Sequence, residues 1–439
     1  MTTVRCDPDI RVLIGSQADR KIVLFDNIDN TNGIASIGNR VREVLRHINL
    51  PIPVEAFDFL TIALSVTAAD EFVSRDDGAY GFVRSISLSI ALAKPAVWKT
   101  QTHALESILR FLTGDDWSLS FTANGLTPPT KSEKKRLVRM IDLSNIEQVC
   151  LFSGGLDSLI GAVNQLKARP NETLLVSRAS TGDQKFQNHL LGRLGSPSHL
   201  SINDRPIKPN GVNWDKEGST RSRSILFLAL AACCASAVSL HRSGLTTPIL
   251  IPENGLIALN PPLTPRRRGS LSTRTAHPHY LQSLQKIFDD VGLGVSIRNP
   301  YEFMTKGEMI KDCADQKLIH NLAPNTISCG KWKRRNQQCG KCVPCLIRRA
   351  SMFAANIPEP VGKYEYGDLS TLTFGAKQSV DLAAVRLAIR CTSEDSVPRW
   401  VSASGPLPTD ELTREKYYQV AWRGLKELQI YLTTQGIKV

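Results

Sequence analysis

The stretch SGGLDS at residues 153–158 decides the fold, because of what stands on either side of it. Residues 149–152 form an apolar run that predicts a short buried strand, and residues 159–166 have the apolar periodicity of a helix. A strand, a Gly-Gly turn and a helix N-terminus bring backbone N–H groups and the positive end of a helix dipole to one place. The stretch therefore predicts a phosphate-binding loop, although it lacks the Gly-x4-Gly-Lys-Ser/Thr pattern of a Walker loop. A glycine-rich turn without a ligand is the plain alternative.

The hexapeptide resembles the PP-loop of ATP pyrophosphatases, which bind ATP, adenylate a substrate and release pyrophosphate. The resemblance implies that backbone N–H groups and hydroxyls of the loop hold the ATP phosphates. Asp157 would hold Mg2+ or order the loop, since Mg2+ takes one or two carboxylates beside phosphate oxygens. A carboxylate that only favours the helix N-terminus is the alternative. The expected nucleotide-binding residues are Ser153, Gly154, Gly155, Leu156, Asp157 and Ser158.

Four cysteines form the second informative pattern. They lie in SCGKWKRRNQQCGKCVPCLIRR, residues 328–349. Three cysteines at i, i+3 and i+6, with one upstream, suit a closed tetrahedral shell of thiolates, which is typical of structural zinc. An iron–sulfur cluster and reduced thiols without a metal are the alternatives. The expected zinc ligands are Cys329, Cys339, Cys342 and Cys345.

A PP-loop followed by Cys-x9-Cys-x2-Cys-x2-Cys resembles QueC, the 7-cyano-7-deazaguanine synthase family. The resemblance covers about residues 146–356, and two weaker segments lie between the end motifs. Residues 221–231 are similar to the family's Arg-Asn-x-x-Phe-Leu helix, and residues 305–310 to its Ser-Lys-x-Glu-Ile segment. The resemblance implies an α/β fold, a parallel sheet of the PP-loop (adenine nucleotide alpha hydrolase-like) type with helices on both faces and a zinc knuckle.

The same resemblance implies the catalytic residues. Arg223 would grip a substrate carboxylate in bidentate fashion, and a surface arginine is the alternative. Lys306 stands at a predicted helix start, which is unfavourable for a purely structural cation, so a role in the site is favoured. The expected catalytic residues are Asp157, Ser158, Arg223 and Lys306.

The chain also departs from this family. About 145 residues precede the loop, Ser224 replaces the family's Asn, and a long insert occupies residues 253–280. These features are more similar to the longer QueC-like proteins of bacterial anti-phage systems, among which the QatC component of the Qat system is the nearest likeness. For such proteins the substrate and the acceptor are open.

Length and composition suit a folded protein of two or three domains. The chain has 439 residues, of which 42% are hydrophobic, enough for two or three domains. Ten cysteines, four of them at metal-binding spacing, fit a reducing compartment better than a disulfide scaffold. No run of eighteen uncharged apolar residues occurs, and the first residues lack the apolar core of a signal peptide. We therefore expect a cytoplasmic protein with no membrane partner.

The net charge of +13 predicts attraction to polyanions such as nucleic acid, ATP or an acidic protein. Basic clusters occur within residues 131–139, 266–268 and 331–335, and solvated surface charge is their plain alternative. Few aromatic residues accompany these clusters, so stacking on single-stranded bases is not indicated. A protein partner is favoured over nucleic acid.

The pattern along the chain predicts four parts. Residues 1–123, with strands expected at 11–14 and 85–91 among others, form a β-rich accessory or docking domain, and 124–140 form a linker. Residues 141–360, where strands and helices alternate, form the parallel α/β core, and 361–439 a helical extension. No internal repeat is visible.

The resemblance to QueC and to the longer QueC-like proteins implies an ATP-dependent ligase. It would adenylate a carboxylate of the 7-carboxy-7-deazaguanine type and pass it to ammonia or to an amine of a partner protein, using ATP, Mg2+ and Zn2+, in phage defence. A PP-loop tRNA-modifying enzyme, either a thiolase or of lysidine type, is one alternative. A non-catalytic nucleotide-binding component of a defence complex is another.

Overall fold

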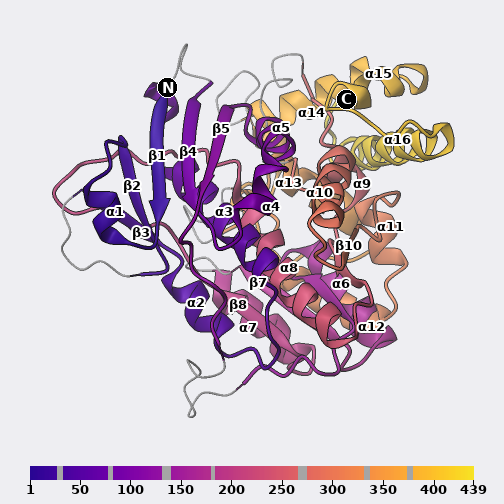
Figure 1. Ribbon diagram of the computed structural model, residues 1–439. Coiled ribbons are helices and arrows are strands. Elements are labelled where there is room, and N and C mark those ends of the chain that lie inside the picture. The colour runs from indigo at the N-terminus through magenta and orange to yellow at the C-terminus, as the bar shows by residue number, and fades with distance from the viewer. Residues whose placement is uncertain are drawn as a thin grey trace.

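The computed structural model describes residues 1–26, 33–77, 83–130, 140–178, 183–264, 274–330, 337–372 and 379–439. The basic clusters at 131–139, 266–268 and 331–335 therefore lie outside the described residues. Within them the chain forms two five-stranded sheets, and the paired strands run parallel (Figure 1). This α/β architecture confirms the predicted fold class at that level.

The first sheet has the strand order β3-β2-β1-β4-β5. Its strands are β1 (Thr2–Asp7), β2 (Arg20–Leu24), β3 (Ile34–Ile37), β4 (Ser85–Ala91) and β5 (Asp116–Thr122). Its helices are α1 (Ile10–Ile14), α2 (Asn39–Leu45), α3 (Val54–Phe72), α4 (Pro95–Lys99) and α5 (Thr102–Thr113). We call residues 1–122 the N-terminal unit. It contains more helical than strand residues, so the prediction of a β-rich unit is wrong.

Two local features explain that error. The strand predicted at 11–14 is helix α1, because the Asp9 carboxylate accepts a hydrogen bond from the Arg11 N–H and starts a helical turn. The largest helix, α3, is apolar on every side and 16 of its 19 residues are buried. A helix without an exposed face lacks the amphipathic period that sequence analysis relies on.

The second sheet has the strand order β10-β9-β6-β7-β8. Its strands are β6 (Gln148–Leu151), β7 (Thr173–Arg178), β8 (His199–Ile202), β9 (Thr247–Leu250) and β10 (Val295–Arg298). Its helices are α6 (Leu156–Ala168), α7 (Asp183–Arg193), α8 (Arg223–His241), α9 (Gly255–Leu259), α10 (Pro278–Asp290), α11 (Lys306–Lys311) and α12 (Gln316–Leu322). Strands β7 and β8 extend the sheet on one side of β6, and β9 and β10 extend it on the other side. The place where the chain changes sides, between β6 and β9, is the switch point of the sheet, and ligands of open parallel sheets bind there, at the carboxyl ends of the strands.

The two sheets repeat one topology. In each, the first strand lies at the centre, the second and third strands extend to one side, and the fourth and fifth to the other. In each, a 19-residue helix precedes the fourth strand: α3 before β4 and α8 before β9. The structure thus shows an internal repeat of topology that the sequence does not reveal.

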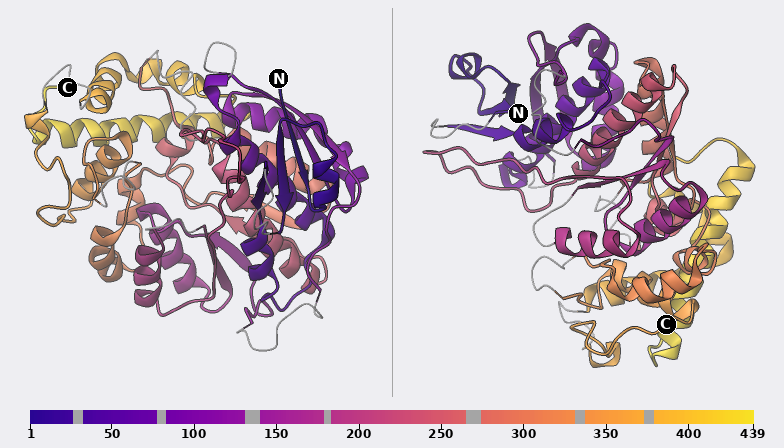
Figure 2. Two further views of the ribbon diagram at one scale, coloured as in Figure 1. Left: turned by 90° about the vertical axis from the view of Figure 1, so that its left-hand side faces the viewer. Right: turned by 90° about the horizontal axis from the view of Figure 1, so that it is seen from below.

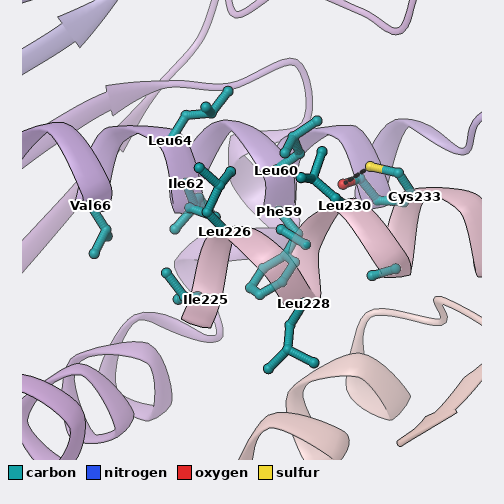
Figure 3. Close-up of a cluster of buried hydrophobic side chains, with 14 of the residues drawn as sticks. Phe59, Leu60, Ile62, Leu64, Val66, Ile225, Leu226, Leu228, Leu230 and Cys233 are labelled. Atoms are coloured by element: carbon teal, nitrogen blue, oxygen red, sulfur yellow. Dashed lines mark hydrogen bonds between the residues drawn. The ribbon is translucent and has the colours of Figure 1, made fainter. Parts of the chain in front are cut away.

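Helices α3 and α8 pack against each other and join the two sheets (Figure 3). Leu60 and Leu226 lie in this contact, and the Cys233 thiol donates to the Ala56 carbonyl over 3.2 Å. One continuous cluster of buried side chains runs from the N-terminal unit into the second sheet. By length and composition α8 is apolar enough to cross a membrane, but 78% of its apolar window is buried inside the protein, so it serves as a core helix.

The C-terminal part is helical. It contains α13 (Val343–Ala354), α14 (Val380–Cys391), α15 (Val397–Ser402) and α16 (Glu411–Thr434). The long helix α16 lies along α13 and α9, as the yellow segment of Figure 2 shows. Its buried side chains complete a second core with α13 and α14.

Candidate functional site

The predicted PP-loop lies at the switch point of the second sheet. Strand β6 ends at Leu151 and α6 begins at Leu156, so the loop connects the central strand to its helix. Strand β7 holds the base of the loop, since the Phe152 N–H donates to the Val176 carbonyl over 2.7 Å and the Ser177 hydroxyl to the Phe152 carbonyl over 2.6 Å. Among the described residues no side chain caps α6, so the helix presents the N–H groups of its first turn to an anion.

Hydrogen bonds within the loop fix its shape. The Ser158 hydroxyl accepts from the Gly154 N–H at 3.1 Å and donates to the Gly155 carbonyl at 3.0 Å. Gly154 has φ +83°, and a Cβ there would stand 3.1 Å from the Gln187 side chain, so both conformation and space favour glycine. The side chain of Leu156 is buried in the core, so only its backbone faces the loop. Ser158 therefore orders the loop in this structure.

Asp157 and Lys306 form a buried ion pair beside the loop. Lys306 Nζ lies 3.1 Å from Asp157 Oδ1, and the two residues are 6% and 5% exposed. Thr305 and Glu308 make a capping box that begins α11 at Lys306. Burial works against the charged form of Asp157, but the positive charge of Lys306, with hydrogen bonds from its neighbours, outweighs it and keeps the pKa of Asp157 below its usual value. The attraction within the pair therefore offsets the free-energy cost of burying the Lys306 ammonium group and of placing a positive charge at the start of a helix.

Two residues that follow β9 complete the network. The Asn254 side-chain amide donates to Asp157 Oδ2 over 2.8 Å and reaches Glu253 Oε1 over 3.2 Å. Burial, and then the negative charge of Asp157, raise the pKa of Glu253 well above its ordinary value. The two neighbouring carboxyl groups thus differ in pKa, since the charge of Lys306 helps to keep that of Asp157 low.

Glu253 and Asn254 were not among the site residues predicted from sequence. The signal that would have revealed them is the stretch Pro-Glu-Asn-Gly, which begins two residues after the end of strand β9. Strand β9 lies next to β6, so residues at its carboxyl end face the PP-loop. This neighbour relation depends on the strand order, which the sequence does not specify.

Arg223 lies apart from the other predicted catalytic residues. It stands at the first position of α8, its side chain is exposed, and its Nε donates to the Thr220 hydroxyl over 2.5 Å. Its backbone carbonyl accepts from Arg178, at the end of β7, over 3.4 Å. The structure thus brings Asp157, Ser158 and Lys306 together, whereas the described contacts of Arg223 are with Thr220 and Arg178.

The four predicted cysteines converge on one point. Their sulfur atoms all lie within 4.8 Å of one another, with 3.9 Å between Cys342 and Cys329 and 4.0 Å between Cys339 and Cys345. Zinc–sulfur bonds of about 2.3 Å in a tetrahedron place sulfurs about 3.8 Å apart, so the set fits Zn2+. Backbone N–H groups of Cys339 and Cys342 donate to neighbouring sulfurs at 3.3 Å, which favours thiolates.

Residues of the C-L-I-R-R run support this cysteine cluster. Arg349 donates to the carbonyls of Gly340, Tyr366 and Gly367 and so clamps the turn between the cysteines. Gly340 has φ +78°, and a Cβ there would lie 2.6 Å from the Tyr366 carbonyl. Upstream, Ile327 lies against the PP-loop, because its N–H donates to the Gly154 carbonyl over 3.5 Å. The cysteine cluster therefore supports one wall of the PP-loop site.

Comparison with protein families identifies a match in the second half of the chain. The family described as queuosine biosynthesis protein QueC matches residues 275–356, from just before α10 through the cysteine cluster to the end of α13. No curated protein and no solved structure matches the chain. The matched segment includes Lys306 and the four cysteines but not the PP-loop. Over residues 275–356 the chain is therefore QueC-like.

Proposed function

We propose that this protein is an ATP-dependent, AMP- and pyrophosphate-forming ligase that activates a carboxylate of the 7-carboxy-7-deazaguanine type. The observation that carries the proposal is the buried Asp157–Lys306 pair beside an uncapped helix N-terminus at the switch point, joined to a QueC-like segment. A helix N-terminus and a lysine suit the phosphates of ATP, and Asp157 suits Mg2+.

The proposed reaction has two steps. A carboxylate oxygen of the acid bonds to the α-phosphorus of ATP, the bond to the bridging oxygen breaks, and pyrophosphate leaves. An amine nitrogen then bonds to the carboxyl carbon and loses a proton, and AMP leaves. The amine is ammonia or a group on a partner protein. In this scheme the loop and Lys306 neutralise the charge that develops on the leaving pyrophosphate.

The defence role and the protein partner extend this proposal. The QueC-like segment together with an added N-terminal unit supports a ligase within an anti-phage system, with the N-terminal unit as the docking part. A pull-down from the native host with tagged protein tests the partner. Salt-sensitive RNA binding with no protein recovered would favour the tRNA-modifying alternative instead.

Pyrophosphate release with and without 7-carboxy-7-deazaguanine tests the reaction. We expect release that depends on the acid and on Mg2+, and formation of AMP in equal amount. The control is Lys311→Met, an exposed lysine on the same helix as Lys306, which should leave the rate unchanged, whereas Lys306→Met should abolish release. Binding of ATP without acid-dependent release would support the non-catalytic alternative.

A further inference from the structure

A pocket of about 190 Å³ lies between the N-terminal unit and the second sheet. One wall is the corner from β3 to α2, at Ser36 to Arg40, and the other is the segment after β8, at Asn203 to Ile207. Two backbone hydrogen bonds between Ser36 and Ile207, of 3.2 and 2.8 Å, hold these walls together. The pocket therefore requires both units.

The pocket contains a buried carboxylate with spare hydrogen-bonding capacity. Asp204 is 6% exposed, and its Oδ2 has no hydrogen-bond partner in the part of the chain that the structure describes. Backbone N–H groups of Gly38 and Arg205 bind the carboxylate. Burial raises the pKa of Asp204 to about 6 despite these bonds and the nearby charges of Arg178 and Arg40. A buried acceptor left unpaired is costly, which points to a ligand that donates a hydrogen bond.

The complementary feature is a cation beside the pocket: Arg178 does not line the pocket itself, but its charge acts on Asp204. Arg178 is half-buried at the end of β7, and among the described residues it forms no salt bridge. Partial burial, and then the charge of Arg223, lower the pKa of Arg178 to about 10. A guanidinium in this situation favours a bound anion.

The positions of these two groups suit one ligand beside the PP-loop. Arg178 follows Ser177, whose hydroxyl bonds the base of the loop, and Asp204 follows the next strand, β8. Neighbouring strands lie about 4.8 Å apart, so the loop and Asp204 are separated by roughly 10 Å across the sheet. A bicyclic heterocycle with a carboxyl substituent spans this separation with its acid group toward the loop.

We propose that this pocket binds the acid that the enzyme activates, a planar heterocycle whose ring N–H edge donates to Asp204 and whose carboxylate pairs with Arg178. This assignment rests on the proposed function and makes the N-terminal unit part of the substrate site. It also gives the carboxylate to Arg178, whose side chain is half-buried, in place of the exposed Arg223.

Calorimetric titration of 7-carboxy-7-deazaguanine, 7-deazaguanine and ATP into the full-length protein and its variants tests this proposal. Arg178→Gln should weaken binding of the acid roughly 10- to 100-fold and leave that of 7-deazaguanine unchanged, as loss of a charged partner predicts. Asp204→Asn should weaken both heterocycles by a similar factor, and Asp204→Glu should restore part of the loss. ATP affinity should stay the same in all of them.

The matched controls are Arg193→Gln at the end of α7 and Asp215→Asn in the segment between β8 and α8, both exposed side chains, which should bind all three ligands like the wild type. Wild-type protein that fails to bind the acid, acid affinity that survives both Arg178→Gln and Asp204→Asn, or a parallel loss of ATP affinity would each overturn the proposal.

An assay of pyrophosphate release distinguishes a failure of the pocket assignment from a failure of the ligase assignment. Acid-dependent release that is insensitive to both substitutions would leave the ligase assignment standing and remove the pocket assignment. Acid binding that depends on Arg178 and Asp204, without any release, would do the reverse.

Discussion

At the scale of single residues, the Asp157–Lys306 pair links stability to catalysis. Removing one partner of a buried ion pair leaves the other uncompensated and costs about 3–5 kcal/mol, whereas replacing both with neutral groups can be nearly neutral. Structural and chemical roles of this pair can therefore be separated.

We expect Asp157→Asn to lower both the melting temperature and the rate of pyrophosphate release, the latter by roughly 100- to 1000-fold. The double variant Asp157→Asn, Lys306→Met should recover much of the melting temperature without recovering activity. Thermal denaturation and the release assay measure the two effects, with the exposed Asp312→Asn as the control. A double variant that regains activity would contradict a chemical role for this pair.

His277 should make the fold sensitive to acid. It is fully buried at the start of α10, where its Nδ1 accepts from the His279 N–H over 3.2 Å. Burial, then the charges of Arg274 and His279, lower the pKa of His277 to about 3. Between about pH 6.5 and pH 3, His277 therefore binds a proton in the unfolded chain but stays neutral in the folded protein. Stability from this group is complete above pH 6.5 and falls with decreasing pH, by up to about 1.4 kcal/mol per pH unit.

We expect His277→Asn, which keeps a capping acceptor but does not titrate, to reduce the loss of unfolding free energy between pH 6.5 and 4. Urea denaturation at several pH values measures it. His103→Asn, on the exposed face of α5, serves as the control. If the free energy of unfolding falls equally with decreasing pH in both variants and the wild type, groups other than His277 cause the acid sensitivity.

At the scale of elements, the cysteine cluster and its clamp should depend on metal. We expect one zinc ion per chain. Cys342→Ala should remove the zinc and lower the melting temperature, because structural zinc contributes on the order of 10 kcal/mol in small sites. The kinetic constants of the protein that remains folded should change little. Elemental analysis and thermal denaturation measure this. The exposed Cys391 lies outside the cluster, so Cys391→Ala is the control. Iron with visible absorption, or no metal at all, would contradict the zinc assignment.

The contact between α3 and α8 should carry a large share of the stability. Leu226 is 1% exposed in this contact and Leu240, on the same helix, is 54% exposed. Leu226→Ala should therefore lower the free energy of unfolding by about 2–5 kcal/mol, and Leu240→Ala by far less. Chemical denaturation of the two variants gives the comparison, and equal effects would argue against a shared core.

The difference between what was and was not predictable is clearest at this scale. The strand–loop–helix around residues 153–158 and the convergence of the four cysteines were predictable, because each depends on a local stretch of chain. The roles of Glu253 and Asn254 were not, because they depend on β9 pairing with β6. Helix α3 had mixed character in the sequence because it is buried on all sides. The Asp204 pocket depends on two segments more than 160 residues apart, as the 163-residue separation of Arg40 and Asn203 in their hydrogen bond shows.

At the scale of the whole molecule, the N-terminal unit and the second sheet share one core. A chain that begins at residue 141 would expose the apolar face of α8 that α3 covers. We expect this truncated chain to aggregate or to bind hydrophobic dyes. Its far-UV circular dichroism should show no more than native-like secondary structure, and its tertiary packing should be lost. A soluble, cooperatively folding fragment that still binds ATP would contradict the shared core.

The position of α3 in the sequence has a consequence for synthesis on the ribosome. Its partner helix is far away along the chain, since Ala56 and Cys233 are 177 residues apart. At about 5–20 residues per second, roughly 10–35 seconds pass between the emergence of these two residues. During that interval the nascent chain exposes the apolar face of α3 that α8 later covers, and chaperones bind exposed apolar surface of this kind. Production of this protein should therefore respond to chaperone supply and to translation speed in the stretch before residue 223.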